Sequence, residues 1–547
     1  MISSVVKIFV DENEFDFDRR DSGDNGKFNL DSETSVSKLK AHFFETLANL
    51  GEVVKYKRDE TKPGGKLARA VDADNAIVAC FHEQPPELPC RSLQHTKGGL
   101  MLPGGFLNRW TAHTATVLLV TSQSQARRLT NAFHHFPIHV MPFYPRLDHH
   151  FLDAADGNDS DLQYKKKSYD LLYAGRLIAN KGHYQLIRAL NKWKCSAKTL
   201  ALVGEFEQDF TIDQSGATHA NFPQFHAREV SGLNRNLEIL QGSALPSKQL
   251  ASKYRQAEIF AYPSIHEDEN YGLAPREAAA CGAIPLVTDL CGLGEFGRKA
   301  HGGIVRTWAT LGGIRFSLRE IPLEAERILS WDSKQKKAAT NTNKGLVASE
   351  CSGANSLTQM KEAVHKLVAL PVAPPPTGGW RCPDRLKRLA KYGPTSFREA
   401  LSCGSDADPD GLYVDGTGYH NKSYSEARFL TAIQGLYTTW PTPPKLLPGV
   451  GLRGFWRVGL FNDERALIEY GFPGPRLLRF SESEWPHVQA CARQSAQGEV
   501  SFEIANDHTA GIFQEAVDLG YLVPDDPESC ILPEPNDTLP KPINPTT

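Results

Sequence analysis

The sequence predicts an α/β protein built from two successive Rossmann-like units, each a doubly wound parallel sheet, followed by a separate C-terminal α+β domain. Apolar, β-branched segments alternate with helical patterns from residue 4 to about residue 120, which is typical of a parallel sheet. The same alternation restarts near Asp170. The stretch PVAPPPTGG at 371–379 then interrupts it, because this composition does not form regular structure.

The first unit begins with a strand at 4–10 (SVVKIFV). The polar, acidic stretch that follows, 11–33, is long for a strand-to-helix connection, so it is either a functional loop or a partly disordered segment. A helix is predicted over 35–50, with Gly51 as its C-cap. EVVKY, AIVACF and TVLLVTS predict further strands.

In the second unit, DLLYAG predicts a strand, KGHYQLIRALNKW a helix, and TLALVGE, LEILQG, EIFAYPS and AIPLVTD four more strands. The polar spacer before it carries three consecutive lysines at 165–167, which we interpret as a solvated linker. The predicted units are an N-terminal domain, a second domain with a closing helix near 355–370, a linker and an accessory domain of unknown role, at 1–163, 164–370, 371–379 and 380–547.

Composition limits the classes of function. Lys and Arg number 61 against 64 Asp and Glu, a net charge of -3, so no broad attraction to nucleic acid is expected. The start of the chain lacks the pattern of a secretory signal, and no window reaches the roughly 18 apolar residues of a membrane span. The ten scattered cysteines form no C-x-x-C pair and are expected to be reduced thiols. We therefore expect a cytoplasmic protein, which could still touch a membrane peripherally.

The segment 258–293 carries the most chemistry. A strand leads into a loop rich in carboxylates, then to Gly272 and a helix over about 274–281. The N-terminus of a helix offers free N–H groups and a partial positive charge to an anion such as a phosphate. Glu277, early in that helix, could reach past bound phosphates to hydroxyl groups. Ligands of open α/β sheets bind at the carboxyl ends of strands, where this loop lies.

Two cations follow the first strand of the second unit. Arg176 comes directly after DLLYAG, and Lys181 precedes the next helix. At the carboxyl end of a strand they would suit a pyrophosphate, with Arg176 forming bidentate hydrogen bonds and Lys181 acting as a point charge. The alternative is two surface cations in a strand-to-helix loop.

These residues resemble a known family. Glu269 and Glu277, spaced E-x7-E after a strand that ends in Pro-Ser, are similar to the motif of retaining GT-B glycosyltransferases of the family 4 type. Residues 269–273 (ENYGL) stand where the family has E-G-F-G-L, and 277–282 (EAAACG) where it has E-A-M-A-C-G. The resemblance covers roughly 115–345. Further matches are the G-R-x4-K pair and two strand-end glycines, namely Arg176, Lys181, Gly204 and Gly242.

The resemblance implies a GT-B architecture, with two Rossmann-like domains facing a cleft and the donor in the second. It implies that Glu277 binds the donor ribose, that Glu269 contacts the donor sugar, and that Arg176 and Lys181 hold the diphosphate. No metal and no cofactor are expected. The implied donor-binding backbone is that of Gly175, Gly242, Gly272 and Leu273. His95 would hydrogen-bond the donor sugar, with His82 as a weaker alternative.

The implied activity is that of a hexosyltransferase, which moves a sugar from a nucleoside diphosphate sugar to an acceptor hydroxyl with retention, in glycan, polysaccharide or glycoconjugate biosynthesis. The partners would be a nucleotide sugar and a glycan, lipid-linked or small-molecule acceptor. A disaccharide synthase, a nucleotide-sugar epimerase and a non-catalytic scaffold protein on the same fold are the alternatives. Asn270, Arg276 and the charged 266–268 depart from the family pattern and leave the donor sugar open.

The C-terminal part is less informative. Asp406–Asp410 resembles the start of an EF-hand loop, but Thr417 stands at the twelfth position, where calcium binding needs a carboxylate, so we interpret it as a polar loop. A helix and a short strand are expected over 508–524, in a unit of winged-helix type. Three tryptophans could stack on sugars or belong to the core, namely Trp440, Trp456 and Trp485.

Overall fold

The structure is a computed structural model of the 547-residue chain. It describes residues 6–12, 35–57, 67, 69, 76–81, 90–95, 117–126, 139–152, 167–177, 181–205, 236–240, 245–266, 269–310, 313–372, 444–454, 458–461, 465–471, 474–494, 500–518, 521–525 and 530–531.

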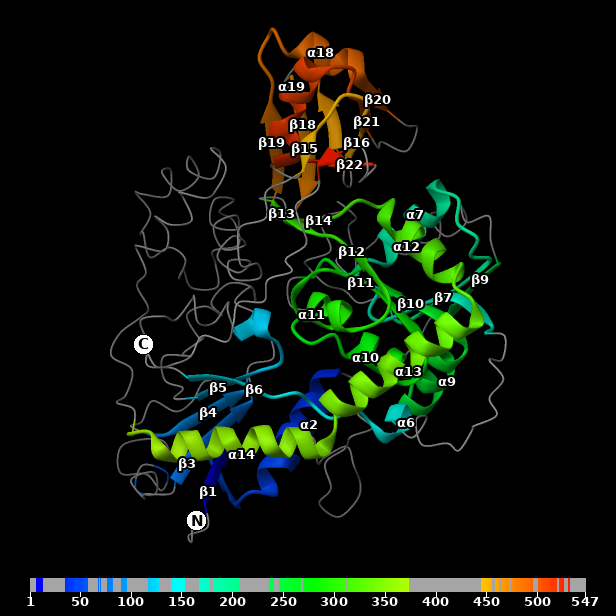
Figure 1. Ribbon diagram of the computed structural model, residues 1–547. Coiled ribbons are helices and arrows are strands. Elements are labelled where there is room, and N and C mark those ends of the chain that lie inside the picture. Colours follow the sequence, from blue (N-terminus) through cyan, green and yellow to red (C-terminus); the bar gives the residue numbers. More distant parts are fainter. Residues whose placement is uncertain are drawn as a thin grey trace, which may run out of the picture.

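The first domain contains a six-stranded parallel sheet in the order β2-β1-β3-β4-β5-β6 (Figure 1). Its central strands are buried along their whole length, as expected where helices cover both faces of a parallel sheet. The predicted helix at 35–50 is confirmed as α2, Ser35–Ala48. The strands are β1 Lys7–Asp11, β2 Glu52–Tyr56, β3 Ala76–Phe81, β4 Ser92–His95, β5 Val117–Val120 and β6 His139–Pro142.

The second domain contains another six-stranded parallel sheet, in the order β12-β11-β10-β7-β8-β9. The strand order reverses between β7 and β10, which is the position where doubly wound sheets bind ligands. The strands are β7 Tyr169–Ala174, β8 Thr199–Val203, β9 Asn236–Leu240, β10 Ala257–Tyr262, β11 Ile284–Thr288 and β12 Gly303–Val305. The helices are α7 His183–Lys192, α9 Ser247–Arg255, α10 Leu273–Ala280, α11 Cys291–Lys299, α12 Glu320–Leu329 and α13 Ser333–Glu350.

The chain passes between the two domains twice. It crosses first through residues 143–148 into α6, His149–Leu152, and returns after α13 into α14, Gly353–Ala369. The crossings touch each other, since the amide of Leu147 donates to the carbonyl of Cys351 at 3.4 Å. The closing helix predicted near 355–370 is thus α14, and it packs on the first sheet and on α2 (Figure 1).

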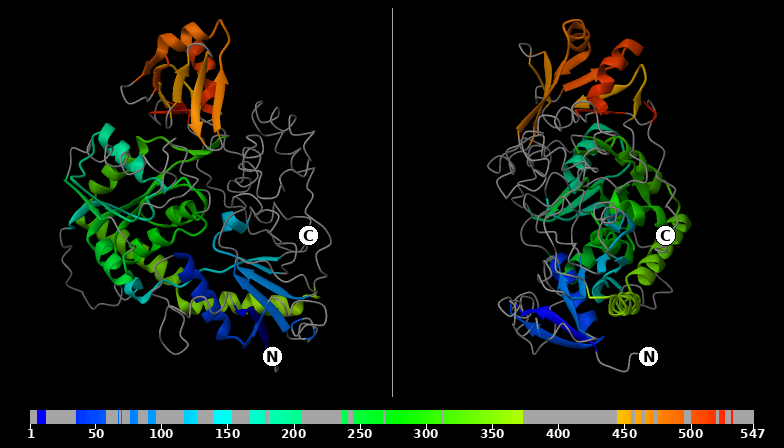
Figure 2. Two further views of the ribbon diagram at one scale, coloured as in Figure 1. Left: turned by 180° about the vertical axis from the view of Figure 1, so that it is seen from behind. Right: turned by 90° about the vertical axis from the view of Figure 1, so that its left-hand side faces the viewer.

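The described residues from 444 onward form a separate α+β body of short antiparallel sheets with the helices α18 Trp485–Cys491 and α19 Asp507–Asp518 (Figures 1 and 2). The helix and strand expected over 508–524 are confirmed as α19 and β22, Leu522–Pro524. The other strands are β15 Lys445–Leu446, β16 Gly451–Gly454, β17 Val458–Phe461, β18 Ala466–Gly471, β19 Gly474–Arg479, β20 Ala492–Gln494, β21 Val500–Glu503 and β23 Cys530–Ile531.

Asp525 attaches this body to the second domain. Its carboxylate accepts from Lys192 of α7 at 2.8 Å, and its carbonyl accepts from the Ser317 hydroxyl at 3.0 Å. The hairpin of β13 Trp308–Thr310 and β14 Gly313–Arg315 belongs to the second domain. Trp485 is buried in the core of the C-terminal body, whereas Trp440, Trp456 and the loop Asp406–Asp410 lie outside the described residues.

The cysteines whose side chains the structure describes are free thiols, mostly buried. In the described parts of the chain, no helix has the length and apolar character needed to cross a bilayer.

Candidate active site

The loop between β10 and α10 is held in shape by the start of α11. Gly272 has a φ of 69°, in the left-handed region, and a Cβ there would lie 2.6 Å from the Leu293 side chain, so only glycine fits without movement. The amide of Gly292 donates to the carbonyl of Glu269 at 2.9 Å. The N-terminus of α10 is therefore presented at the carboxyl end of β10.

Lys181 and Glu269 form a buried ion pair. Their Nζ and Oε1 atoms are 2.5 Å apart, and the two side chains are 10% and 8% exposed. The hydroxyls of Tyr262 and Ser264 donate to the same carboxylate oxygen at 3.1 and 3.0 Å. The structure thus brings together Lys181, predicted after β7, and Glu269, predicted after β10. The alternative that Lys181 is a surface cation is wrong.

A glycine brings these two segments together. Gly182 lies directly after Lys181 with a φ of 86°, and a Cβ there would lie 2.0 Å from the carbonyl oxygen of Pro263. The backbone before α7 therefore approaches the loop after β10 more closely than any other residue would permit. This contact places Lys181 beside Glu269.

Arg176 is exposed at the end of β7, and its carbonyl accepts from the Tyr173 hydroxyl at 2.9 Å. Its charge acts on the same cluster: burial, and then the charge of Glu269, raise the pKa of Tyr262 well above its usual range, while Arg176 lowers it. Tyr262 therefore stays a hydroxyl that donates to Glu269. Gly175 directly precedes Arg176, and a Cβ there would lie 3.0 Å from the Tyr262 ring.

Glu277 lies about one turn into α10 and is also buried, with 8% of the residue exposed. The Tyr254 hydroxyl of α9 donates to it at 3.5 Å. Burial raises the pKa of Glu277, the charge of Lys38 lowers it, and the charge of Asp148 raises it. Neither Glu269 nor Glu277 is a surface acid.

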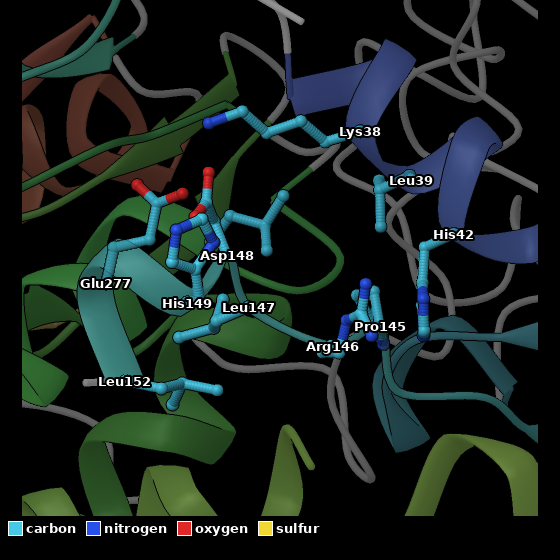
Figure 3. Close-up of a pocket in the computed structure, with 11 residues that line it drawn as sticks. Lys38, Leu39, His42, Pro145, Arg146, Leu147, Asp148, His149, Leu152 and Glu277 are labelled. Atoms are coloured by element: carbon cyan, nitrogen blue, oxygen red, sulfur yellow. The ribbon is translucent and has the colours of Figure 1, made fainter. Parts of the chain in front are cut away.

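Glu277 faces a cavity of about 320 Å³ between the two domains. Its walls come from α2 of the first domain, from the crossover 145–152, and from Leu273 and Glu277 of α10. Figure 3 shows Glu277, Asp148 and His149 gathered at one end, with the tip of Lys38 above them. The volume is at the lower end of the range for small-molecule sites, about 300–1,000 Å³.

The structure places His95 away from the wall of this cavity. It is the last residue of β4, completely buried, with its ring 5.0–5.5 Å from those of Phe43, Phe81 and Phe143. His95 therefore belongs to the aromatic core of the first domain, and its catalytic role stays a prediction. His82 and Gly242 lie outside the described residues.

Arg276, a departure from the family pattern, supports the loop from beneath. Its guanidinium lies 4.0 Å from the ring centre of Tyr271 and 4.6 Å from that of Phe296. It donates to the Tyr271 carbonyl and pairs with Glu350 of α13 at 3.6 Å. Arg276, which departs from the family pattern in the sequence, is thus a buried residue that holds the loop in place.

One group in the described chain has the composition of a metal site, namely Asp148, His149 and His150. The amide of His150 donates to Asp148 Oδ1 at 3.0 Å, and His149 Nδ1 lies 3.1 Å from the same oxygen. The His149 side chain is 65% exposed. These contacts are those of a capping carboxylate at the start of α6, so the cluster has a structural explanation, and the expected independence of metal stays a prediction.

Several residues of the site belong to no sequence motif and were not predicted. Lys38 and Asp148 line the cavity from the first domain and the crossover, while Tyr254, Tyr262 and Ser264 surround the two glutamates. Ser264 and Tyr262 could have been found, since they lie in the strand end IFAYPS just before Glu269. Lys38 could not, because it comes from another domain.

Comparisons with known proteins concern the fold and the second domain. The two Rossmann-like sheets, linked by two crossovers and with α14 returning to the first, form a GT-B fold. Residues 157–306, which contain β7 to β12, match the family model described as glycosyl transferases group 1. This segment of the second domain therefore resembles a group 1 glycosyltransferase domain. Among curated proteins, none matches the chain significantly.

Solved structures of similar shape share little sequence. A glycosyltransferase from Rickettsia africae has 14% identity and a TM-score of 0.46, covering 67% of this chain and 99% of its own. HepE from Anabaena, in complex with UDP and glucose, has 14% identity and a TM-score of 0.43, covering 67% and 100%. Sucrose-phosphate synthase from Thermosynechococcus elongatus has 16% identity and a TM-score of 0.45, covering 66% and 99%.

Proposed function

We propose that this chain is a retaining glycosyltransferase that moves a hexosyl group from a nucleoside diphosphate sugar to an acceptor hydroxyl. One observation carries the proposal: the buried Lys181–Glu269 pair and the buried Glu277 flank the N-terminus of α10, within the segment that matches group 1 glycosyltransferases. This arrangement offers an anion site and a hydroxyl acceptor about one helical turn apart.

In the proposed complex the diphosphate lies at the N-terminus of α10, against the backbone of Gly272 and Leu273. Lys181 and Arg176 neutralise it, and Glu277 accepts hydrogen bonds from the ribose hydroxyls. The acceptor oxygen attacks the anomeric carbon on the face that the diphosphate leaves. As the bond between that carbon and the phosphate oxygen breaks, the acceptor proton passes to the departing oxygen, whose growing charge the two cations stabilise.

The Lys181–Glu269 pair connects the two binding roles. The ammonium donates to Glu269 at 2.5 Å, and two hydroxyls donate to the same carboxylate. A diphosphate would draw Lys181 partly away, which would free a Glu269 oxygen for a sugar hydroxyl. The two roles implied for these residues thus depend on each other. We propose that no metal is needed, because the cations act where a metal would.

We further propose a cytoplasmic protein in glycan, polysaccharide or glycoconjugate synthesis, with a glycan, lipid-linked or small-molecule acceptor. The implied hydrogen bond from His95 to the donor sugar stays a prediction, since the structure places this ring in the aromatic core of the first domain.

Thermal shift with uridine, guanosine and adenosine diphosphates and their sugars tests the proposal, since a ligand that binds only the folded state raises the melting temperature. One base should raise it in the wild type and fail to do so in Glu277→Ala. The matched control is Glu362→Ala, exposed on α14, which should respond as the wild type does.

Turnover then separates an enzyme from a binding protein on the same fold. Arg176→Ala should slow transfer by on the order of 10²-fold, as for loss of a preorganised charge-stabilising group. Wild-type protein that responds to no nucleotide would refute the proposal, and a nucleotide response without transfer to any acceptor would favour the scaffold alternative.

A further inference from the structure

Lys38 belongs to the first domain, yet its ammonium group lies at the donor side of the cavity. It sits on α2 and donates from Nζ to the hydroxyl of Ser247, the first residue of α9, at 2.9 Å. The same atom lies 5.6 Å from the ring centre of Phe151 in α6. These two contacts fix the ammonium between the domains, close to where Glu277 points (Figure 3).

The groups that face Glu277 come from α2, the crossover, α6 and α9. They are Lys38, Asp148, His149 at the same end of the cavity, and the Tyr254 hydroxyl. Burial and the charge of Asp148 raise the pKa of Glu277, whereas Lys38 and the Tyr254 hydroxyl lower it. Of these groups, Lys38 is the cation whose charge lowers the pKa of Glu277.

Asp148, the other carboxylate at this end of the cavity, has few groups that stabilise its charge. The Asp148 side chain is 4% exposed, and its Oδ2 atom has no hydrogen-bond partner in the described structure. Its Oδ1 atom is occupied by the His150 amide and by His149. Two buried carboxylates therefore face one cavity, and a buried charge is costly unless it is paired.

We propose that Lys38 is a positioning residue of the donor site, supplied by the opposite domain, which keeps Glu277 in the carboxylate form that binds the donor. This inference rests on the proposed function of Glu277. A carboxylate has two oxygens that can accept from the two adjacent ribose hydroxyls at once, whereas a protonated acid places a donor where an acceptor is needed. Ser247 and Phe151 hold the ammonium in place, so the charge is present before the donor arrives.

The sign of the pH effect follows from this arrangement. A raised pKa means that Glu277 takes up a proton as the pH falls, and donor affinity is lost with it. Removing Lys38 raises the pKa of Glu277 further, so the loss begins at higher pH. Removing the charge of Asp148 has the opposite effect and extends binding to lower pH.

The test is isothermal titration calorimetry with uridine, guanosine and adenosine diphosphates over about pH 5 to 8, using the one that binds the wild type. Lys38→Met keeps the apolar stem and should weaken binding by about tenfold at the acidic end of the profile, below the pKa of Glu277, which is the effect of one pKa unit. Lys38→Arg should restore both affinity and pH profile. Lys361→Met, exposed on α14, is the control and should match the wild type.

Asp148→Asn keeps a capping side chain and gives a second, independent test that does not require Lys38→Met to fold. It should retain nucleotide binding at a lower pH than the wild type does. Ser247→Ala, which removes only the anchor, should shift the profile in the same direction as Lys38→Met but by less.

The results distinguish this inference from the proposed function. If Glu277→Ala loses binding while Lys38→Met keeps the wild-type affinity and pH profile, the role of Lys38 is overturned and the donor site stands. If Lys38→Met weakens binding equally at every pH, Lys38 is only a contact between the domains, and the inference is overturned as well. Wild-type protein that binds no nucleotide refutes the proposed function itself.

Discussion

Lys181→Met is expected to destabilise the second domain as well as abolish transfer. The substitution keeps the length of the side chain and removes its charge, so Glu269 stays buried without its cation. The Nζ–Oε1 distance of 2.5 Å and side chains exposed by only 10% and 8% place this pair among buried ion pairs, where loss of one partner costs about 3–5 kcal/mol.

The contacts that survive set the magnitude within this range. Tyr262 and Ser264 still donate to Glu269, and hydrogen bonds to a charged group are worth about 1.5–3 kcal/mol each. These hydrogen bonds still stabilise the carboxylate in part, so we expect a loss in the free energy of unfolding at the lower end of that range, about 3 kcal/mol. The double variant with Glu269→Gln buries no charge, and its stability should return to within about 1 kcal/mol of the wild type, since replacing both partners of a buried pair is often neutral.

Guanidinium unfolding of the wild type, both single variants and the double variant gives the coupling energy. The fluorescence of Trp308, buried in the core of this domain, can report the transition. All three variants should lose transfer by on the order of 10²-fold or more. A cost of less than about 1 kcal/mol for Lys181→Met, or a double variant no more stable than Lys181→Met, would show that the ion pair does not stabilise this domain.

Three further substitutions test the same loop. Because burial raises the pKa of Glu277, its ionised form opposes folding above that pKa. Glu277→Gln should therefore raise the free energy of unfolding by on the order of 1 kcal/mol near neutral pH and leave it unchanged at low pH, as measured by urea unfolding at the two pH values. The same variant should lose nucleotide binding. Arg276→Met should lower the free energy of unfolding by at most about 3 kcal/mol, since Glu350 keeps its ion pair with Lys299. An unchanged urea midpoint would contradict a supporting role for Arg276. Gly272→Ala should cost about 1–3 kcal/mol for its left-handed backbone, measured likewise, with Gly345→Ala, which has open space around it, as the control.

The sequence could predict the two sheets because each repeats one simple pattern. Strands such as β3 and β10 are buried on both faces, and continuous apolar segments between helices have few other structures available. The sequence does not reveal that α14 leaves the second domain and packs on the first sheet. An amphipathic helix shows that it covers something, but its pattern does not say which sheet.

The same limit applies to the site. Glu269, Glu277, Arg176 and Lys181 could be found because their spacing within one domain is set by the strand ends that carry them. Lys38 is separated from Glu277 by most of both domains in sequence, and its position depends on how the domains face each other. Such contacts follow from packing over long range and have no local pattern.

The loop between β10 and α10 contacts both crossovers, which connects the candidate site to the arrangement of the domains. The Tyr271 hydroxyl lies 2.8 Å from Cys351 Sγ on the returning crossover, and its ring stacks on Tyr144 of the first crossover at 5.9 Å. Arg276 adds the pair with Glu350, just before the same return. Any rotation of one domain against the other must pass through these crossovers, and therefore through the residues that shape the N-terminus of α10. A change in the angle between the domains would therefore also displace the N-terminus of α10, because the same side chains hold both.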